Sequence, residues 1–257
     1  HEFSCIRFER DGNVLVVTID RPDNDLNAVN AALHADLTAL FPRLQAEREA
    51  RAVLLTGAGR AFSAGGDFAW FPELADRAAL EHLRVDAKNL IYDLLDVHLP
   101  IVCAVNGHAM GLGASVALLC DTIFMARSAT IGDPHVRVGI VAGDGGTLIW
   151  PLAVGPARAK QYLLTGDPLT ADEAERIRLV NTVVSTLPSD DTHPYRTGPW
   201  HPQTEEWDAT PRVVAGSRAS ARTTGAIAGA HTTPQVFING TLIGGSEQLE
   251  DWLRKAA

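Results

Sequence analysis

Two glycine-rich turns hold the residues whose types and spacing could do chemistry. One lies in PIVCAVNGHAMGLGASVALLCDTIFM at residues 100–125, and the other in TGAGRAFSAGGDF at residues 56–68. Each follows a short apolar run typical of a buried strand and leads into a segment with helical pattern. Backbone N–H groups at such a turn have no partner inside the helix that follows, so they can bind an anion or a carbonyl oxygen. The two turns together could hold one carbonyl oxygen between them.

Each turn also has a purely structural interpretation. Glycine between a strand and a helix is a common turn device, used wherever φ is positive or the packing is close. The repetition of the same arrangement favours function, because two convergent backbone N–H groups are a common way to stabilise an enolate or a tetrahedral oxyanion.

The composition excludes several classes of protein. The chain has 257 residues, 46% of them hydrophobic, and 22 glycines, which suits one large or two small globular domains. A formal net charge of -9 argues against a nucleic-acid partner. No apolar run reaches the ~20 residues that cross a bilayer, and the first residues do not form a secretion signal. We therefore expect a cytoplasmic protein without a nucleic-acid or membrane partner, in which Cys5, Cys103 and Cys120 are reduced core residues.

The hydrophobic pattern predicts the elements that must position the two turns. Apolar runs at residues 5–10 and 13–19 predict an antiparallel hairpin across Asp11-Gly12. Residues 27–50 have helical spacing, with a break expected near Pro42. The alternation of strands and helices predicts a layered α/β fold. The other expected elements are strands at 52–57, 101–105 and 122–126, helices at 77–95, 147–154 and 157–164, a loop over 131–146, and a second helix and a strand between 165 and 184.

Four stretches carry a resemblance to a known family. They are RAVLLTGAGRAFSAGGDF, PIVCAVNGHAMGLGASVALLCDTIFMA, GDPHVRVGIVAGDGGTLIWPLAVG and AKQYLLTGDPLTADEAERIRLVNTVV. In order and spacing they resemble the crotonase superfamily, the enoyl-CoA hydratases and isomerases, over residues 4–187. The resemblance implies an α/β core of repeated ββα units, usually assembled as a trimer or a dimer of trimers, that binds acyl-CoA thioesters. It implies no cofactor other than the coenzyme A of the substrate, and we predict no metal site.

The resemblance also assigns roles to residues of the two turns. The oxyanion donors would be the backbone N–H groups of Gly66 and Leu112. Leucine replaces a frequent glycine at the second position, which matters little because only its N–H is used. The coenzyme would lie along the turn at residues 56–68 and the loop after the first strands, near Arg21, Asn27, Ala64 and Asp67. Asp67 could instead simply cap the following turn. The full set of expected substrate-binding residues is Ala64, Gly65, Asp67, Gly111 and Trp150.

The acid and base positions depart from the family pattern. Hydratases of the family usually carry two glutamates that activate water, and this chain has Ser115 and His135 at the matching positions. His135 could act as an acid or base near neutral pH, or be a solvated loop residue. Asp144, between glycines, lies where some superfamily members place a working aspartate, and an apolar pocket would raise its pKa. It could equally be the N-cap of the next helix. We predict Asp144 and His135 as the catalytic residues.

Other side chains near the turns are interpreted more simply. His108 could point into the acyl pocket or pack beside the helix, and we expect a structural role. Four aromatic residues could line an acyl pocket, although core packing is the simpler expectation for each. They are Phe62, Phe68, Trp70 and Trp150.

Two functional classes remain open on the sequence alone. The first is an enzyme that holds a thioester enolate and hydrates or isomerises an enoyl-CoA. The missing glutamates favour isomerisation, whereas hydration is the commoner activity of the family. The second is an acyl-CoA binder or scaffold that has lost its acid and base.

The chain beyond residue 187 is atypical for the family. We therefore expect a crotonase-like core over residues 1–187 and an atypical segment over 188–257, with an irregular loop at 192–211 and a weak helix at 213–230. Residues 232–257 predict a strand, an Asn239-Gly240 turn, a second strand and an amphipathic helix. This part resembles the C-terminal half of a glutaredoxin-like thioredoxin fold. No Cys-x-x-Cys is present, so thiol redox activity is not expected.

Overall fold

The computed structural model describes residues 1–185, 213–215, 236–238 and 241–244, and the chain begins with the predicted hairpin. Strands β1 (Ile6–Asp11) and β2 (Val14–Ile19) pair antiparallel, with Asp11 opposite Val14. Gly12 lies in the turn at φ 55°, a left-handed conformation that glycine adopts at little cost. The prediction of the hairpin and of its turn is therefore confirmed.

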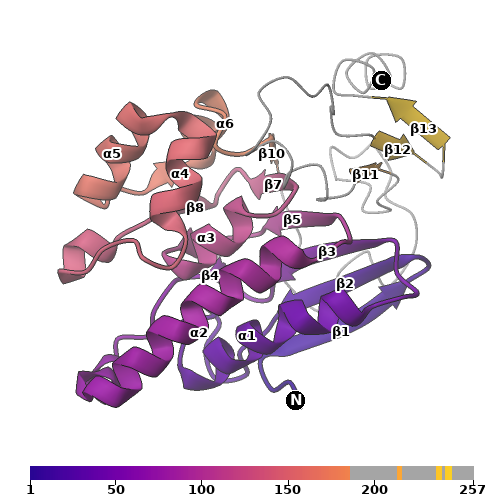
Figure 1. Cartoon of the computed structure of the whole chain (residues 1–257). Coiled ribbons are helices and arrows are strands. Elements are labelled where there is room, and N and C mark those ends of the chain that lie inside the picture. Colours follow the sequence, from indigo (N-terminus) through magenta and orange to yellow (C-terminus); the bar gives the residue numbers. More distant parts are fainter. Residues whose placement is uncertain (186–212, 216–235, 239–240, 245–257) are drawn as a thin grey trace.

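The hairpin forms one edge of a six-stranded sheet (Figure 1). Its order is β1-β2-β3-β5-β7-β10, and every pair after β1–β2 is parallel. Strands β3 and β5 are buried along their whole length, as expected for a parallel sheet covered on both faces. The later strands are β3 (Ala52–Gly57), β5 (Ile101–Val105), β7 (Thr122–Ala126) and β10 (Thr182–Val184).

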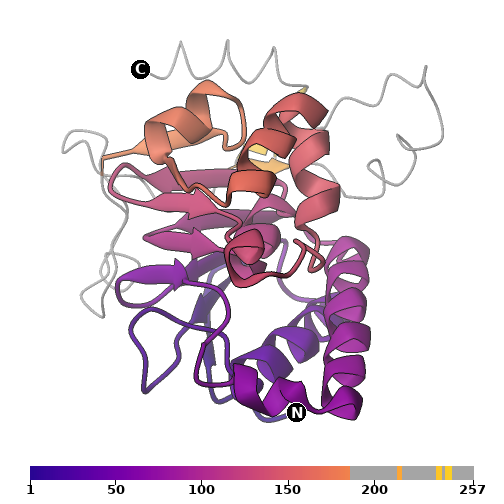
Figure 2. The same cartoon turned by 90° about the vertical axis from the view of Figure 1, so that its left-hand side faces the viewer.

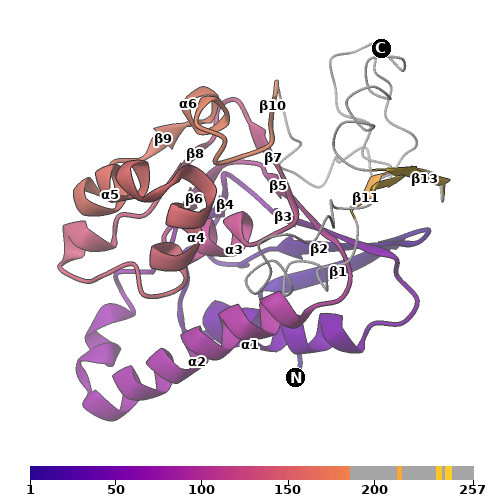
Figure 3. The same ribbon diagram turned by 45° about the horizontal axis from the view of Figure 1, so that its top comes forward.

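Two helices, α1 (Ala31–Ala46) and α2 (Arg77–Asp96), pack side by side against the larger sheet (Figures 1 and 3). Helix α1 begins after Asn30, whose side chain accepts a hydrogen bond from the Leu33 N–H. It then continues through Pro42, so the expected break is wrong. A proline inside a helix costs about 3 kcal/mol, whereas burying one leucine or phenylalanine contributes about 1.5–3 kcal/mol. The buried side chains on both sides of the proline outweigh that cost; they are Leu33, Leu37, Leu40, Phe41 and Leu44.

A second, four-stranded sheet was not predicted from the sequence. Its strands are very short, so none contains enough residues to show an alternating pattern. They pair in the order β4-β6-β8-β9, with the first three parallel and β9 antiparallel to β8. The strands are β4 (Ala61–Ser63), β6 (His108–Met110), β8 (Thr130–Gly132) and β9 (Leu169–Thr170). This sheet matters for function because both glycine turns follow directly from its strands.

The helices that follow β6 lie beside the smaller sheet (Figures 1 and 2). They include the two helices predicted after residue 156, and the strand predicted there is β10. A 3₁₀ turn occupies part of the predicted loop 131–146, and another precedes α2. The elements are η1 (Phe71–Ala75), α3 (Leu112–Leu118), η2 (His135–Val138), α4 (Gly146–Val154), α5 (Pro156–Thr165) and α6 (Ala171–Arg176).

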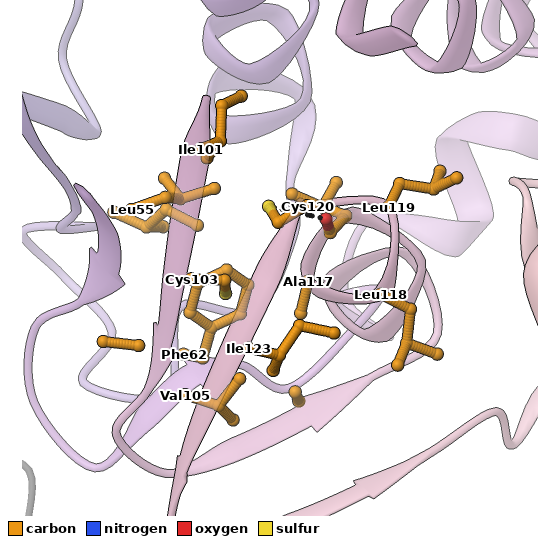
Figure 4. Close-up of a cluster of buried hydrophobic side chains, with 14 of the residues drawn as sticks. Leu55, Phe62, Ile101, Cys103, Val105, Ala117, Leu118, Leu119, Cys120 and Ile123 are labelled. Atoms are coloured by element: carbon orange, nitrogen blue, oxygen red, sulfur yellow. Dashed lines mark hydrogen bonds between the residues drawn. The ribbon is translucent and has the colours of Figure 1, made fainter. Parts of the chain in front are cut away.

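The hydrophobic core runs between β3, β5, β7 and the short helix α3 (Figure 4). Cys103 points from β5 into this cluster, and Cys120 Sγ donates to the Val116 carbonyl oxygen. All three cysteines are free and buried, as expected, and burial raises the pKa of the Cys103 thiol. Because every side chain of α3 is buried, the start of this helix is held firmly in place.

The described residues beyond 185 form three further strands, β11 (Val213–Ala215), β12 (Val236–Ile238) and β13 (Thr241–Gly244). β12 pairs antiparallel with β11 and with β13, which confirms the two predicted strands around Asn239-Gly240. The weak helix expected from residue 213 is wrong over 213–215, which form a strand. The predicted loop at 192–211 and the C-terminal amphipathic helix lie outside the described residues. None of the described helices is both long enough and apolar enough to cross a bilayer.

Candidate active site

The turn before α3 leaves a backbone donor free. Gly111 precedes the helix at φ 54°, and its N–H donates to the Gly132 carbonyl oxygen at 3.0 Å. Leu112 is the first residue of α3, so its N–H has no acceptor inside the helix. Within the described residues no other acceptor approaches it. The predicted donor is therefore available for a ligand.

The turn after β4 presents the second donor. Gly65 has φ 84°, and its carbonyl oxygen accepts from the Val29 N–H at 2.7 Å. The Asp67 N–H donates to the Val29 carbonyl oxygen at 2.9 Å. Gly66 lies between these two bonds, and its own N–H has no acceptor among the described residues. Val29 thus holds the turn in place while leaving this one N–H unused.

The two turns touch each other. A methyl group at Gly65 would lie 3.0 Å from the Met110 carbonyl oxygen, and one at Gly111 would lie 3.9 Å from the Gly65 Cα. The same methyl group at Gly111 would come within 3.2 Å of His135 Cε1. The glycines are therefore needed for close approach as well as for positive φ. They bring two free N–H groups into one region, with an imidazole beside them.

Four polar side chains form a connected cluster next to these turns. Ser115 Oγ donates to Asp144 Oδ1 at 3.3 Å, and Asp144 Oδ2 lies 3.3 Å from His135 Nε2. The other ring nitrogen, His135 Nδ1, lies 2.5 Å from Asp133 Oδ1. Ser115 comes from α3, while Asp133, His135 and Asp144 come from the segment between β8 and α4. The structure thus brings the two predicted catalytic residues together and adds Asp133.

The cluster shifts the pKa values of its two central groups. Burial raises the pKa of Asp144, and the charge of Asp133 adds to the effect, whereas His135 and Ser115 oppose it. For His135, burial alone would lower the pKa, but the hydrogen bond to Asp133 and the charges of Asp144 and Asp133 more than offset it, so the pKa is raised. The pKa of Asp144 therefore lies above that of an exposed aspartate, and the pKa of His135 lies above that of an exposed histidine. Groups with perturbed pKa values of this kind are typical of sites that exchange protons.

The alternative role of Asp144 as a helix cap is wrong. Gly145 occupies the N-cap position of α4 at φ 111°, and no side chain caps the helix. The Asp144 carboxylate points instead to Ser115 and His135. The same cluster offers one ligand atom each from Asp133, His135 and Asp144 within 4.8 Å of one another. Both imidazole nitrogens of His135 face these carboxylates, so the three side chains form a hydrogen-bonded acid–base group.

Three polar residues near the turn after β4 have side chains that are already engaged in structural hydrogen bonds. The Arg21 guanidinium donates to Asp23, to Asp67 and to the Ala28 carbonyl oxygen. Asp67 also accepts from the Ala69 N–H at 2.9 Å, which is the turn-capping role considered above. The Asn27 side chain is buried and makes hydrogen bonds with backbone groups of four residues, which are Ile19, Arg21, Ala58 and Ala61. These side chains shape the loop, so the backbone there is what a ligand can contact.

The aromatic residues divide between core and surface. Phe62 and Trp150 are fully buried, and Trp150 packs against Tyr162. This burial places the indole in the core, and gives no support to the predicted contact between Trp150 and the substrate. Trp70 packs against the core and lies beside His34. Phe68 is 68% exposed, so its expected core role is wrong.

His108 lies exposed on β6, and its Nδ1 is 2.7 Å from Thr130 Oγ1 on the neighbouring strand β8. This contact between two strands agrees with the structural role expected for it. Asp133 is the residue of the cluster that the sequence interpretation missed. Its only signal was an aspartate two residues before His135, at the end of a strand too short to be predicted.

The sequence of this chain is similar to those of known proteins of one family. A family model described as enoyl-CoA hydratase/isomerase matches residues 9–194. A protein of Clostridium acetobutylicum named short-chain-enoyl-CoA hydratase is 37% identical over 186 residues, covering 71% of this chain and 70% of its own length. A protein of Syntrophomonas wolfei named crotonyl-CoA hydratase is 36% identical over 184 residues, with coverage of 71% and 70%.

Solved structures show the same relationship. An enoyl-CoA hydratase/isomerase from Mycobacterium paratuberculosis superposes with a TM-score of 0.68 at 43% identity, covering 71% of this chain and 73% of that chain. An enoyl-CoA hydratase from Thermoplasma volcanium superposes with a TM-score of 0.65 at 31% identity, with coverage of 70% and 72%. The family model spans well over half of the sequence. This chain belongs to the enoyl-CoA hydratase/isomerase family of the crotonase superfamily.

Proposed function

We propose that this protein is an enzyme that adds water to an enoyl-CoA thioester through an enolate intermediate. The observation that carries the proposal is the meeting of two free backbone N–H groups, on Gly66 and Leu112, beside the His135–Asp144 pair. Relatives named as hydratases of short-chain enoyl-CoA and crotonyl-CoA support the same substrate class. The proposed activity belongs to fatty acid metabolism.

The proposed reaction needs one base and one acid. The thioester carbonyl oxygen accepts hydrogen bonds from the Gly66 and Leu112 N–H groups, which favour the negative charge that develops on it. The Asp144 carboxylate takes a proton from water as the water oxygen bonds to Cβ, and His135 gives a proton to Cα. Water is then added across the double bond. A proton returns from Asp144 to His135 across their 3.3 Å contact, which restores the starting state.

Isomerisation of the double bond is the second candidate, and one observation favours it. Ser115 and His135 replace the two glutamates usual in hydratases, and a single carboxylate can remove a proton from Cγ and return it to Cα of the same enolate.

The acid–base cluster also argues against a simple acyl-CoA binder, since buried groups with raised pKa values are typical of catalytic sites.

A panel of acyl-CoA thioesters with product identification tests the proposal. Crotonyl-CoA should yield 3-hydroxybutyryl-CoA, and a 3-enoyl-CoA of longer chain should reveal any shift of the double bond. Saturated acyl-CoA serves as the control for hydrolysis. Binding of crotonyl-CoA by calorimetry without any product from the panel would contradict the proposal and favour the non-catalytic binder.

The Ser115 hydroxyl should tune the base without taking part in the chemistry. Its hydrogen bond lowers the pKa of Asp144, so Ser115→Ala raises that pKa further. Because Asp144 must be deprotonated to accept a proton, activity is lost as the pH falls through its pKa. We expect the acidic limb of the kcat/KM profile to shift upward by about one pH unit, which corresponds to the net contribution of one hydrogen bond to the carboxylate. Thr56→Ala, which removes a buried hydroxyl bonded to the Ala104 carbonyl oxygen, should leave the profile unchanged.

The remaining features of the proposal concern binding and assembly. The backbone of Ala64, Gly65 and Gly111 is proposed to contact the thioester and pantetheine, while Asp67 acts indirectly by fixing Arg21.

Assembly as a homotrimer or hexamer and a cytoplasmic location are proposed from the family. Several large apolar side chains exposed on α4, α5 and the loop before them support contacts between subunits; they are Val138, Ile140, Val141, Leu148, Leu152 and Leu164.

A further inference from the structure

Asp133 is a buried carboxylate with one defined partner. It lies directly after β8 and is 1% exposed. Its Oδ1 lies 2.5 Å from His135 Nδ1 and 3.3 Å from the His135 backbone N. Its Oδ2 is buried and has no hydrogen-bond partner among the described residues. A buried carboxylate costs free energy unless its charge is compensated, so the imidazole is the group that compensates it.

From this geometry we infer that Asp133 is a positioning residue: its carboxylate accepts from His135 Nδ1–H and fixes the ring, so that Nε2 faces Asp144 and the turn at Gly111 as the proton donor. The inference rests on the proposed function, because it assigns the acid and the base of that reaction. It deepens the proposal by separating the two roles: His135 gives the proton to Cα, and Asp144 takes the proton from water.

The surroundings of His135 support this division. The titratable groups that face the imidazole within the described residues are Asp133, on the same loop, and Asp144, on the loop before α4. The third side, at Gly111, presents only glycine backbone. An imidazole between two carboxylates can donate from both nitrogens only when it is protonated. Arg137, on the same 3₁₀ turn, donates instead to Asp167 and to the Thr165 carbonyl oxygen.

Gly146 provides the space that Asp133 needs. A methyl group at Gly146 would lie 2.2 Å from Asp133 Oδ2, which no real contact tolerates, and 2.9 Å from the Ala142 Cβ. Gly146 is in helix α4 and does not have a positive φ, so glycine is required here because it has no side chain and not because of its backbone conformation. The helix start and the carboxylate therefore fit together only with glycine at this position.

The test is Asp133→Asn, which keeps the size of the side chain and removes its charge. The pKa of His135 should fall by about one unit or more, because an opposite charge in contact typically raises a pKa by one to three units. An acid is active only while protonated, so the basic limb of the kcat profile should shift to lower pH by the same amount. We expect kcat at the pH optimum to fall at least about tenfold, with KM little changed.

Titration of His135 by NMR with ¹⁵N-labelled histidine gives a readout that does not depend on the substrate. In the free protein, the Nδ1-protonated tautomer and a raised pKa are expected, and the raised pKa should be lost in Asp133→Asn, whose amide oxygen can still accept from Nδ1–H. This measurement separates the two proposals. If no thioester of the panel is turned over, the proposed function fails, yet the titration still decides whether Asp133 controls His135.

Two further variants keep the test decisive if Asp133→Asn folds poorly. Gly146→Ala should displace the Asp133 carboxylate and reproduce the downward shift of the His135 pKa without altering either catalytic side chain. Asp36→Asn removes another carboxylate that is 1% exposed, one that accepts from the Ser4 and Cys5 N–H groups, and should leave the His135 titration unchanged. An unchanged His135 pKa and basic limb in both Asp133→Asn and Gly146→Ala would overturn the inference.

Discussion

Replacing Asp144 with alanine should lower turnover of the best enoyl-CoA substrate by about 10²–10⁴-fold, the usual contribution of a general acid or base. The carboxylate is the only group of the described site that contacts both Ser115 and His135, and burial raises its pKa. The proposed oxyanion donors and the backbone of the two turns do not depend on its charge. The dissociation constant for an unreactive acyl-CoA should therefore change little.

The matched variant for this prediction is Asp144→Asn. The amide keeps the shape of the side chain and can still accept a hydrogen bond from Ser115, but it cannot take a proton at neutral pH. Single-turnover kinetics with crotonyl-CoA, together with calorimetry on butyryl-CoA, separate catalysis from binding. Turnover of Asp144→Asn within a few fold of the wild type would remove Asp144 from the mechanism.

The second large effect is expected from Leu112→Pro, which deletes one of the two proposed oxyanion donors. Proline has no N–H, yet it is well accepted at the first position of a helix, where that N–H has no intrahelical partner. Leu112 is the first residue of α3 and follows a glycine, so the backbone tolerates the substitution. Loss of one such donor typically costs about 10²–10³-fold in kcat.

Leu112→Ala is the control for this substitution. Both variants lose the buried leucine side chain, which costs about 2–5 kcal/mol of stability, but alanine keeps the N–H. The two should therefore melt at similar temperatures and differ in kcat by the factor that the donor contributes. Equal kcat values for the two variants would show that the Leu112 N–H does not stabilise the enolate.

The larger sheet and its helices could be predicted from the sequence because their patterns are local. Residues 13–19, 52–57 and 101–105 are apolar runs of strand length, and each forms a strand close to the expected bounds. Helix α2 has enough turns to show its period. The break predicted at Pro42 is wrong because it also rests on local propensity alone. Burial of the surrounding helix face, which local propensity does not include, outweighs the cost of the proline.

The smaller sheet escaped prediction because pairing between distant segments creates it. Strands β4, β6 and β8 have three residues each, so none is a recognisable unit before it meets its neighbours. Their pairing places the turn at Gly65–Gly66 against the turn at Gly111–Leu112. The presence of two donor turns was visible in the sequence, whereas their contact depends on tertiary structure.

Glycine turns and motifs that lie close together along the chain were enough to predict the fold class, the family and the candidate residues Asp144 and His135. How these residues contact one another became clear from the folded structure. It joined Ser115 to Asp144 across 29 positions and gave Asp133 a role at His135. It also showed that Trp150 is core and Phe68 is surface. The physical reason is that hydrogen-bond partners, burial and pKa shifts depend on distances in space, which a pattern of residue types along one chain does not contain.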